Sequence, residues 1–227
     1  MAEIMIMEKE IIEKDAMNLG YPFEMGGELT TAYFIDVSRI ENDGADENKE
    51  FILEFLIHQQ VFPLYVSIVD EYGLHEEHDA FFKQNNLSYV VLDLDTQFRS
   101  GDVKVRYKEY HPCYTITVQN AEELRLVLNK TYWLASENLF YTISYSDNLS
   151  FKLEEIKRWR LKLIRPIGVL TMHPNMTCFK IAHDGNGFYL LSNDESYIPI
   201  EHLVTRLPKG TVISQINEDW LLDDETD

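Results

Sequence analysis

The densest cluster of metal-binding residue types is the sequence HEEHD at residues 75–79. On a helix, residues three and four apart are neighbours, so His75, His78 and Asp79 would share one face. Zinc takes such ligands, but it needs a third or fourth ligand and a partner for each histidine. The other five histidines are scattered singly, and the spacing H-E-x-x-H does not occur. His75 and His78 are therefore weak metal candidates, and the alternative is an exposed helix start whose acids favour the positive end of the helix dipole.

A second group of candidate ligands, Asp93 and Asp95, stands at the end of the apolar run at residues 87–94. At the carboxyl end of a strand in an open α/β sheet, two carboxylates can hold Mg²⁺ or a hydroxylated substrate. A solvated turn has the same composition. No expected strand is followed by a Gly-rich phosphate loop, because neither G-x-G-x-x-G nor G-x-x-x-x-G-K-[ST] is present. Asp93 and Asp95 are also weak metal candidates, and we predict no cofactor.

Two further motifs do not fit this sequence. The sequence DGNG at residues 184–187 begins like a calcium loop, but Phe188 stands at its fifth position and no Glu stands at its twelfth. The serine hydrolase motif G-x-S-x-G is absent. We therefore assign no catalytic residue, and the sequence leans towards a protein that is not an enzyme.

Charge is the strongest signal in the chain. The 39 acidic residues outnumber the 20 basic ones, which gives a net charge of −19. Before Arg99 there are 21 acidic and 5 basic residues. From Arg99 to Lys180 there are 8 acidic and 13 basic residues, and after Lys180 there are 10 acidic and 2 basic residues. Such a field repels nucleic acid and anionic lipid and attracts a basic protein. Solubility alone is the alternative explanation of the charge.

The basic residues gather between Lys152 and Arg165, where Phe151 and Trp159 are interleaved with them. This composition can contact nucleic acid, but in so acidic a chain we expect it to dock on the acidic regions of the same molecule. At the carboxyl end, Trp220 lies between acidic residues that include Asp223 and Asp224. We predict that these three bind a protein partner.

Apolar periodicity and turn residues predict the elements that must position these groups. The region 1–20 is expected to be a short amphipathic helix, and residues 103–110 and 113–118 are expected to form a hairpin. Asp46 is expected to cap one helix and Asn120 another. Strands are expected at 30–38, 61–69, 87–94, 139–145, 177–182, 187–191 and 211–216, and further helices at 47–60 and 75–84.

The order strand, helix, strand, helix, strand over residues 30–94 favours a helix-covered sheet with parallel connections. The fold class is therefore mixed α/β: a helix-covered mixed sheet followed by a smaller antiparallel β-rich unit. We expect an α/β domain over residues 1–165 and a small β-rich unit over residues 166–227 with an acidic tail. The alternative is that both halves share one sheet.

Location and function follow from these features. No signal peptide or membrane-spanning run is visible, and the two cysteines, Cys113 and Cys178, are expected to be reduced thiols of a cytoplasmic protein. We expect a non-enzymatic binding protein for a basic partner, such as an immunity or antitoxin-type inhibitor or a charge mimic, that binds neither nucleic acid nor membrane. The alternative is a small α/β enzyme, such as a metal-assisted hydrolase, with Asp93 and Asp95 at strand ends.

Overall fold

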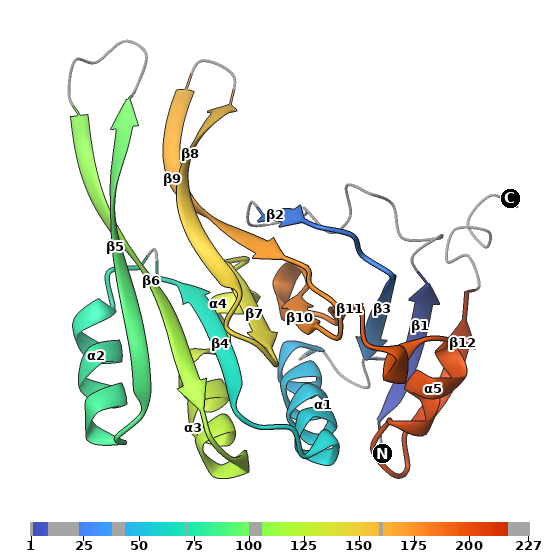
Figure 1. Cartoon of the computed structure of the whole chain (residues 1–227). Coiled ribbons are helices and arrows are strands. Elements are labelled where there is room, and N and C mark those ends of the chain that lie inside the picture. The colour runs from blue at the N-terminus through green and yellow to red at the C-terminus, as the bar shows by residue number, and fades with distance from the viewer. Residues whose placement is uncertain are drawn as a thin grey trace, which may run out of the picture.

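The computed structural model describes residues 2–8, 23–37, 44–70, 72–99, 106–158 and 161–217, without the side chains of residues 93–99, 106–110, 156–158 and 161–164. Within these residues the chain is a mixed α+β fold, as expected from the sequence (Figure 1). The helices are α1 (Gly44–Gln59), α2 (His75–Gln84), α3 (Ala121–Thr131), α4 (Trp133–Ser136) and α5 (Ile200–Thr205). The strands are β1 (Glu3–Glu8), β2 (Phe23–Gly26), β3 (Thr31–Val37), β4 (Leu64–Val69), β5 (Ser88–Arg99), β6 (Arg106–Val118), β7 (Tyr141–Ser144), β8 (Leu149–Arg158), β9 (Leu161–Thr171), β10 (Thr177–Ile181), β11 (Phe188–Ser192) and β12 (Val212–Ile216).

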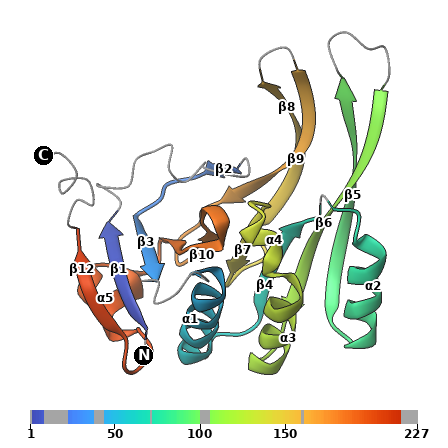
Figure 2. The ribbon, with the colours of Figure 1, turned by 180° about the vertical axis from the view of Figure 1, so that it is seen from behind.

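Nine of these strands form one mixed sheet in the order β12-β1-β3-β11-β10-β7-β4-β6-β5. The other three form a small sheet in which β9 pairs with β8 on one side and β2 on the other. The two sheets are joined where Phe98 and Arg99 of β5 pair with β9. In Figures 1 and 2 the hairpins β5–β6 and β8–β9 rise from the same side of the molecule.

The expected parallel connections are present, since β3, β4 and β5 run in the same direction and are linked through α1 and α2, but the connected strands are not neighbours in the sheet. β4 and β5 both pair antiparallel with β6, so they run in the same direction but never touch as neighbours. The physical reason is that β6 returns directly from β5 and occupies the place beside β4. Within the described residues, the parallel pairs are β1 with β12 and β2 with β9.

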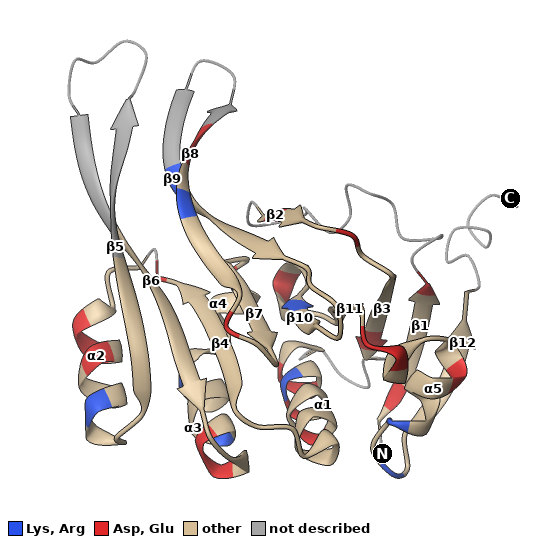
Figure 3. Cartoon of the chain, in the orientation of Figure 1, with Lys and Arg blue, Asp and Glu red and all other residues tan. Residues whose placement is uncertain are grey.

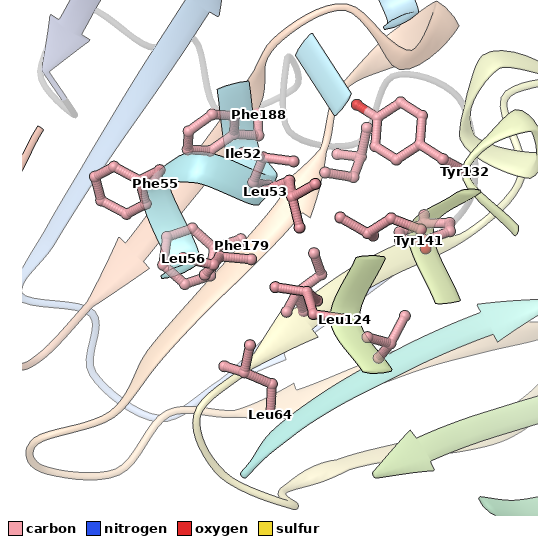
Figure 4. Packing of buried hydrophobic residues seen from close by; sticks show 14 of the residues in the cluster. Ile52, Leu53, Phe55, Leu56, Leu64, Leu124, Tyr132, Tyr141, Phe179 and Phe188 are labelled. Atoms are coloured by element: carbon pink, nitrogen blue, oxygen red, sulfur yellow. The ribbon is translucent and has the colours of Figure 1, made fainter. Parts of the chain in front are cut away.

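Helices α1, α2 and α3 stand in a row against one face of the large sheet (Figures 1 and 2). The apolar spacing of α1 places Ile52, Phe55 and Leu56 on the side that faces the sheet, where all three are fully buried. Phe55 packs edge-on against Phe179 of β10 at 5.8 Å and against Phe188 of β11 at 6.3 Å (Figure 4). This is the main core of the protein, and it joins residues from both halves of the sequence.

The other face of the large sheet is covered by the small sheet. Met172, Met176 and Cys178 belong to one apolar cluster there, and Val69, Cys113 and Phe140 form another. Cys113 and Cys178 are both buried free thiols. Burial raises the pKa of Cys178 to about 12, so this thiol is protonated at neutral pH.

Three local expectations are corrected by the structure. Residues 3–8 form a strand, not a helix, because Ile4 and Ile6 alternate with outward residues and are fully buried between β3 and β12; residues 9–20 lie outside the described part. Residues 106–118 form the single strand β6 and not a hairpin, since β5 is long enough to pair with its whole length. The helix α1 begins at Gly44, so Asp46 lies in its first turn and is not its cap.

The expected division at residues 165 and 166 falls inside β9. Strands β10 and β11, which follow it, lie in the middle of the large sheet between β7 and β3. Both halves of the chain therefore contribute to one sheet, which is the alternative stated above.

Candidate functional site

Strand β5 is the last strand of the large sheet, and most of its outer edge is open. Residues Ser88 to Gln97 pair with β6 on one side, and β9 joins the other side only at Phe98 and Arg99. Among the described residues, no strand covers the edge between Ser88 and Gln97. Such an edge carries backbone N–H and C=O groups that can pair with another extended chain.

The open edge carries three consecutive exposed apolar residues. Val90 is 70% exposed, Val91 is 37% exposed and Leu92 is 42% exposed. Their exposure is unusual for a strand, because Val and Leu are normally among the most buried residues. Val90 and Leu92 lie on the face away from α2, and Val91 lies on the same face as Tyr89, which packs on Phe82 of α2 at 5.2 Å.

Helix α2 places an acidic side chain beside this edge. Burial raises the pKa of Tyr89, and the nearby Asp79 carboxylate adds to the increase. The Asp79 side chain is 36% exposed and lies against Tyr89, and its Oδ2 is 3.8 Å from Nζ of Lys83. Glu76 and Glu77 of the same helix are exposed. The acidic and basic positions of α2 are coloured red and blue in Figure 3. The edge therefore combines an open backbone, apolar side chains and a partly exposed carboxylate.

The other face of α2 is fixed by a buried pair of polar side chains. Nδ1 of His78 lies 3.3 Å from Oδ2 of Asp70, and both side chains are at most 1% exposed. Burial acts to raise the pKa of Asp70, but the adjacent His78 ring and a hydrogen bond from the Tyr72 N–H hold that pKa below its ordinary value. The His78 ring lies 6.0 Å from the rings of Phe82 and of Tyr114. This pair attaches α2 to the end of β4 and is closed to solvent.

The structure also reveals a buried lysine that sequence reasoning missed. Lys180 of β10 is 4% exposed, and its Nζ lies 5.6 Å from the Phe23 ring and 5.8 Å from the Tyr189 ring. Burial lowers its pKa to about 8. The available signal was a lysine inside the otherwise apolar strand TCFKI, in which every residue is buried.

The predicted site residues are placed as follows. His75 and His78 both lie on α2, but His78 faces the sheet, so the alternative of an exposed helix start is wrong for it. Asp79 is turned towards Tyr89 instead of joining them. Among residues whose side chains are described, no group of three or more His, Cys, Asp or Glu is arranged to hold a metal ion.

Asp93 and Asp95 do not end a strand. β5 continues to Arg99, with Asp93 paired to Pro112 and Asp95 to Tyr110, so the premise that they stand at the carboxyl end of a strand is wrong. Their side chains are outside the described set. Trp220, Asp223 and Asp224 lie outside the described residues, and their predicted role in partner binding stays a prediction.

The basic segment 152–165 lies on the hairpin β8–β9. Lys152 makes an ion pair with Glu24 of β2, with Nζ and Oε1 2.7 Å apart. Their interaction lowers the pKa of Glu24 and raises that of Lys152. This one contact is of the kind expected for a basic segment that docks on acidic residues of its own chain.

None of the described helices is long and apolar enough to cross a membrane. Comparisons with protein-family models, with curated proteins and with solved structures found no match to this chain.

Proposed function

We propose that this chain is a non-enzymatic binding protein whose acidic surface engages a basic protein partner. The observation that carries the proposal is the charge of the helix layer: α1, α2 and α3 together hold nine acidic and four basic residues. All three helices cover the same face of the large sheet (Figures 1 and 2). An acidic face of this kind increases the rate at which a basic protein associates and repels nucleic acid.

The groups that could support chemistry favour a structural role. Asp70 and His78 are closed to solvent, and Lys180 is covered by Phe23 and Tyr189. A catalytic group must be within hydrogen-bond reach of a substrate, which burial of this degree prevents. An inhibitor of a basic enzyme, of the immunity or antitoxin type, or a charge mimic would be specific forms of the proposed function.

The proposal is tested by two charge-reversal variants with equal net charge. One carries Glu54→Lys and Glu76→Lys on the helix layer, and the other carries Glu28→Lys and Glu201→Lys elsewhere; all four side chains are exposed. Proteins captured from a cell extract at low salt are identified by mass spectrometry. We expect the wild type to capture basic proteins, the first variant to lose them and the second variant to retain them. Equal loss with both variants, or capture of proteins that are not basic, would contradict the proposal.

A further inference from the structure

We propose that the open edge of β5 binds an extended segment of the basic partner as an added strand. This inference rests on the proposed function and specifies where and in what conformation the partner binds. The site consists of the edge of β5 from Ser88 to Leu92 together with Asp79 of α2.

The backbone of β5 supplies the main interaction. Between Ser88 and Leu92 this strand pairs only with β6, so its outer N–H and C=O groups face away from the sheet. An extended peptide can form a ladder of hydrogen bonds with such groups, which gives affinity, while its alternate side chains give specificity. The edge has none of the usual protections in this stretch, since it carries neither proline nor lysine.

The two faces of the edge select different side chains of the added strand. Residues of the added strand that lie beside Val90 and Leu92 would cover these two side chains, which are 70% and 42% exposed. We therefore expect these residues of the partner to be apolar. Residues beside Val91 would lie on the face that carries α2. The Asp79 carboxylate, 36% exposed, lies on that face beside Tyr89, so we expect Lys or Arg at this position. The partner segment therefore alternates apolar and basic residues.

A second copy of this chain is a poor occupant. Helix α2 beside this edge holds three acidic residues and one lysine, so pairing two β5 edges would bring two acidic helices together. Asp79 would then meet a region that also carries Glu76 and Asp79, and like charges that meet across an interface are destabilising. A basic chain supplies the charge that the edge lacks.

The opposite edge of the large sheet fits such a segment less well. β12 pairs only with β1 among the described strands, and it exposes Val212 by 46% and Ile216 by 40%. These two side chains are four residues apart, whereas those of β5 are consecutive. The chain just before β12 carries Arg206 and Lys209, which would repel a basic segment. β12 therefore provides a matched control site.

The test uses the full chain and a synthetic peptide of nine residues that alternates valine and lysine. Two further peptides have the same side chains and charge but carry methyl groups on alternate backbone nitrogens, one on the odd-numbered and the other on the even-numbered residues. A methyl group on a nitrogen that would pair with β5 prevents strand pairing. Affinity is measured by calorimetry for the wild type, for Val90→Lys and for Val212→Lys. Both substitutions are at exposed valines, and amide hydrogen exchange checks that the fold is kept.

We expect the unmodified peptide to bind the wild type and Val212→Lys equally, and to bind Val90→Lys at least about tenfold more weakly. The peptide whose methyl groups lie on the nitrogens that pair with β5 should bind the wild type more weakly by a similar factor. Amides within residues 88–92 should exchange more slowly in the complex. Equal binding to Val90→Lys, or equal binding of both methylated peptides, would overturn the added strand.

The remaining outcomes separate this inference from the proposed function. If binding depends on salt but ignores Val90→Lys and methylation, the acidic surface still binds basic chains and only the added strand is refuted. If the wild type self-associates and Val90→Lys abolishes this, a second copy occupies the edge, and the inference is overturned. If Val212→Lys alone weakens binding, the site lies on β12, which also overturns it.

Discussion

At the scale of single residues, the two most informative features are the buried Asp70–His78 pair and the buried Lys180. Asp70 and His78 are paired 3.3 Å apart without solvent, and Lys180 lies between two aromatic rings. Neither group is exposed to a ligand, so their effects should be visible in stability rather than in binding. Both can be tested with changes that preserve shape.

Replacing Asp70 with Asn should destabilise the protein by about 1–3 kcal/mol at pH 7, because it removes the buried carboxylate that faces His78 and accepts from the Tyr72 N–H. Since the folded-state pKa of Asp70 is lowered, its contribution is fully present above the unfolded pKa of about 3.9 and is lost as the pH falls through the folded value. Urea unfolding between about pH 2 and pH 7 measures both effects. Asp147→Asn, at an exposed position, is the control and should change stability by less than about 0.5 kcal/mol. If the free energy of unfolding of Asp70→Asn falls with decreasing pH as much as that of the wild type, the stabilising role of the Asp70 carboxylate is refuted.

Lys180 should oppose folding at neutral pH. Its folded-state pKa is lowered to about 8 from an ordinary value of 10.5, so the folded protein loses its proton more easily than the unfolded chain does. The free energy of unfolding should therefore rise as the pH increases from about 8 towards 10.5. Lys180→Met should stabilise the protein at pH 7 by about 1–3 kcal/mol and remove this rise, which urea titrations at pH 7.5 and 9.5 would detect. A less stable Lys180→Met protein would show that the charged amine is needed.

At the scale of elements, helix α3 offers the clearest local test. Oδ1 of Asn120 accepts hydrogen bonds from the N–H groups of Glu122 and Glu123, each at 3.0 Å. Asn120→Ala should therefore cost about 1 kcal/mol of stability. Asn129→Ala, at an exposed position in the same helix, is the matched control and should be neutral or slightly stabilising because alanine favours helix. Equal effects of the two substitutions would contradict the capping role.

Local signals in the sequence predicted many of the elements correctly. The apolar spacing of α1, the bounds of α2, the Asn120 cap and the hairpin β10–β11 are all confirmed. Strand order was not predictable in this way, because nothing in β4 or β5 indicates that β6 will lie between them. The strand at residues 3–8 was missed because Ile4 and Ile6 were interpreted with a helical period, although they alternate.

The candidate site was predicted only in part. The helix with HEEHD was recognised, but the inward direction of His78 and the turn of Asp79 towards Tyr89 depend on contacts between distant segments. Val90, Val91 and Leu92 were expected in an apolar strand, as they are found. Their exposure follows from the position of β5 at the end of the sheet, which a single sequence does not indicate.

At the scale of the whole molecule, the sheet and main core join the two halves of the chain. Because β10 and β11 lie between β7 and β3, residues 1–165 alone would lack the middle of the sheet. We predict that this fragment does not fold, and that the full chain unfolds in one transition. Far- and near-ultraviolet circular dichroism spectra of the fragment show whether it has secondary structure and fixed packing. A fragment that unfolds cooperatively would support two separate units instead.

The charge pattern also belongs to this scale. The chain is acidic, then basic, then acidic, and the described part places nine acidic and four basic residues on the three helices that cover one face. Lys152 of the basic segment is paired with Glu24 of the same molecule. The acidic helix layer is therefore the surface that we assign to the basic partner.

The most direct test of this assignment is the association rate of the captured basic partner with the purified chain, measured by stopped flow at several salt concentrations. We predict a rate that falls at least about tenfold between about 0.05 M and 0.5 M salt, and a similar decrease at low salt for Glu54→Lys with Glu76→Lys but not for Glu28→Lys with Glu201→Lys. A rate that is independent of salt, or that both double variants decrease equally, would contradict the account.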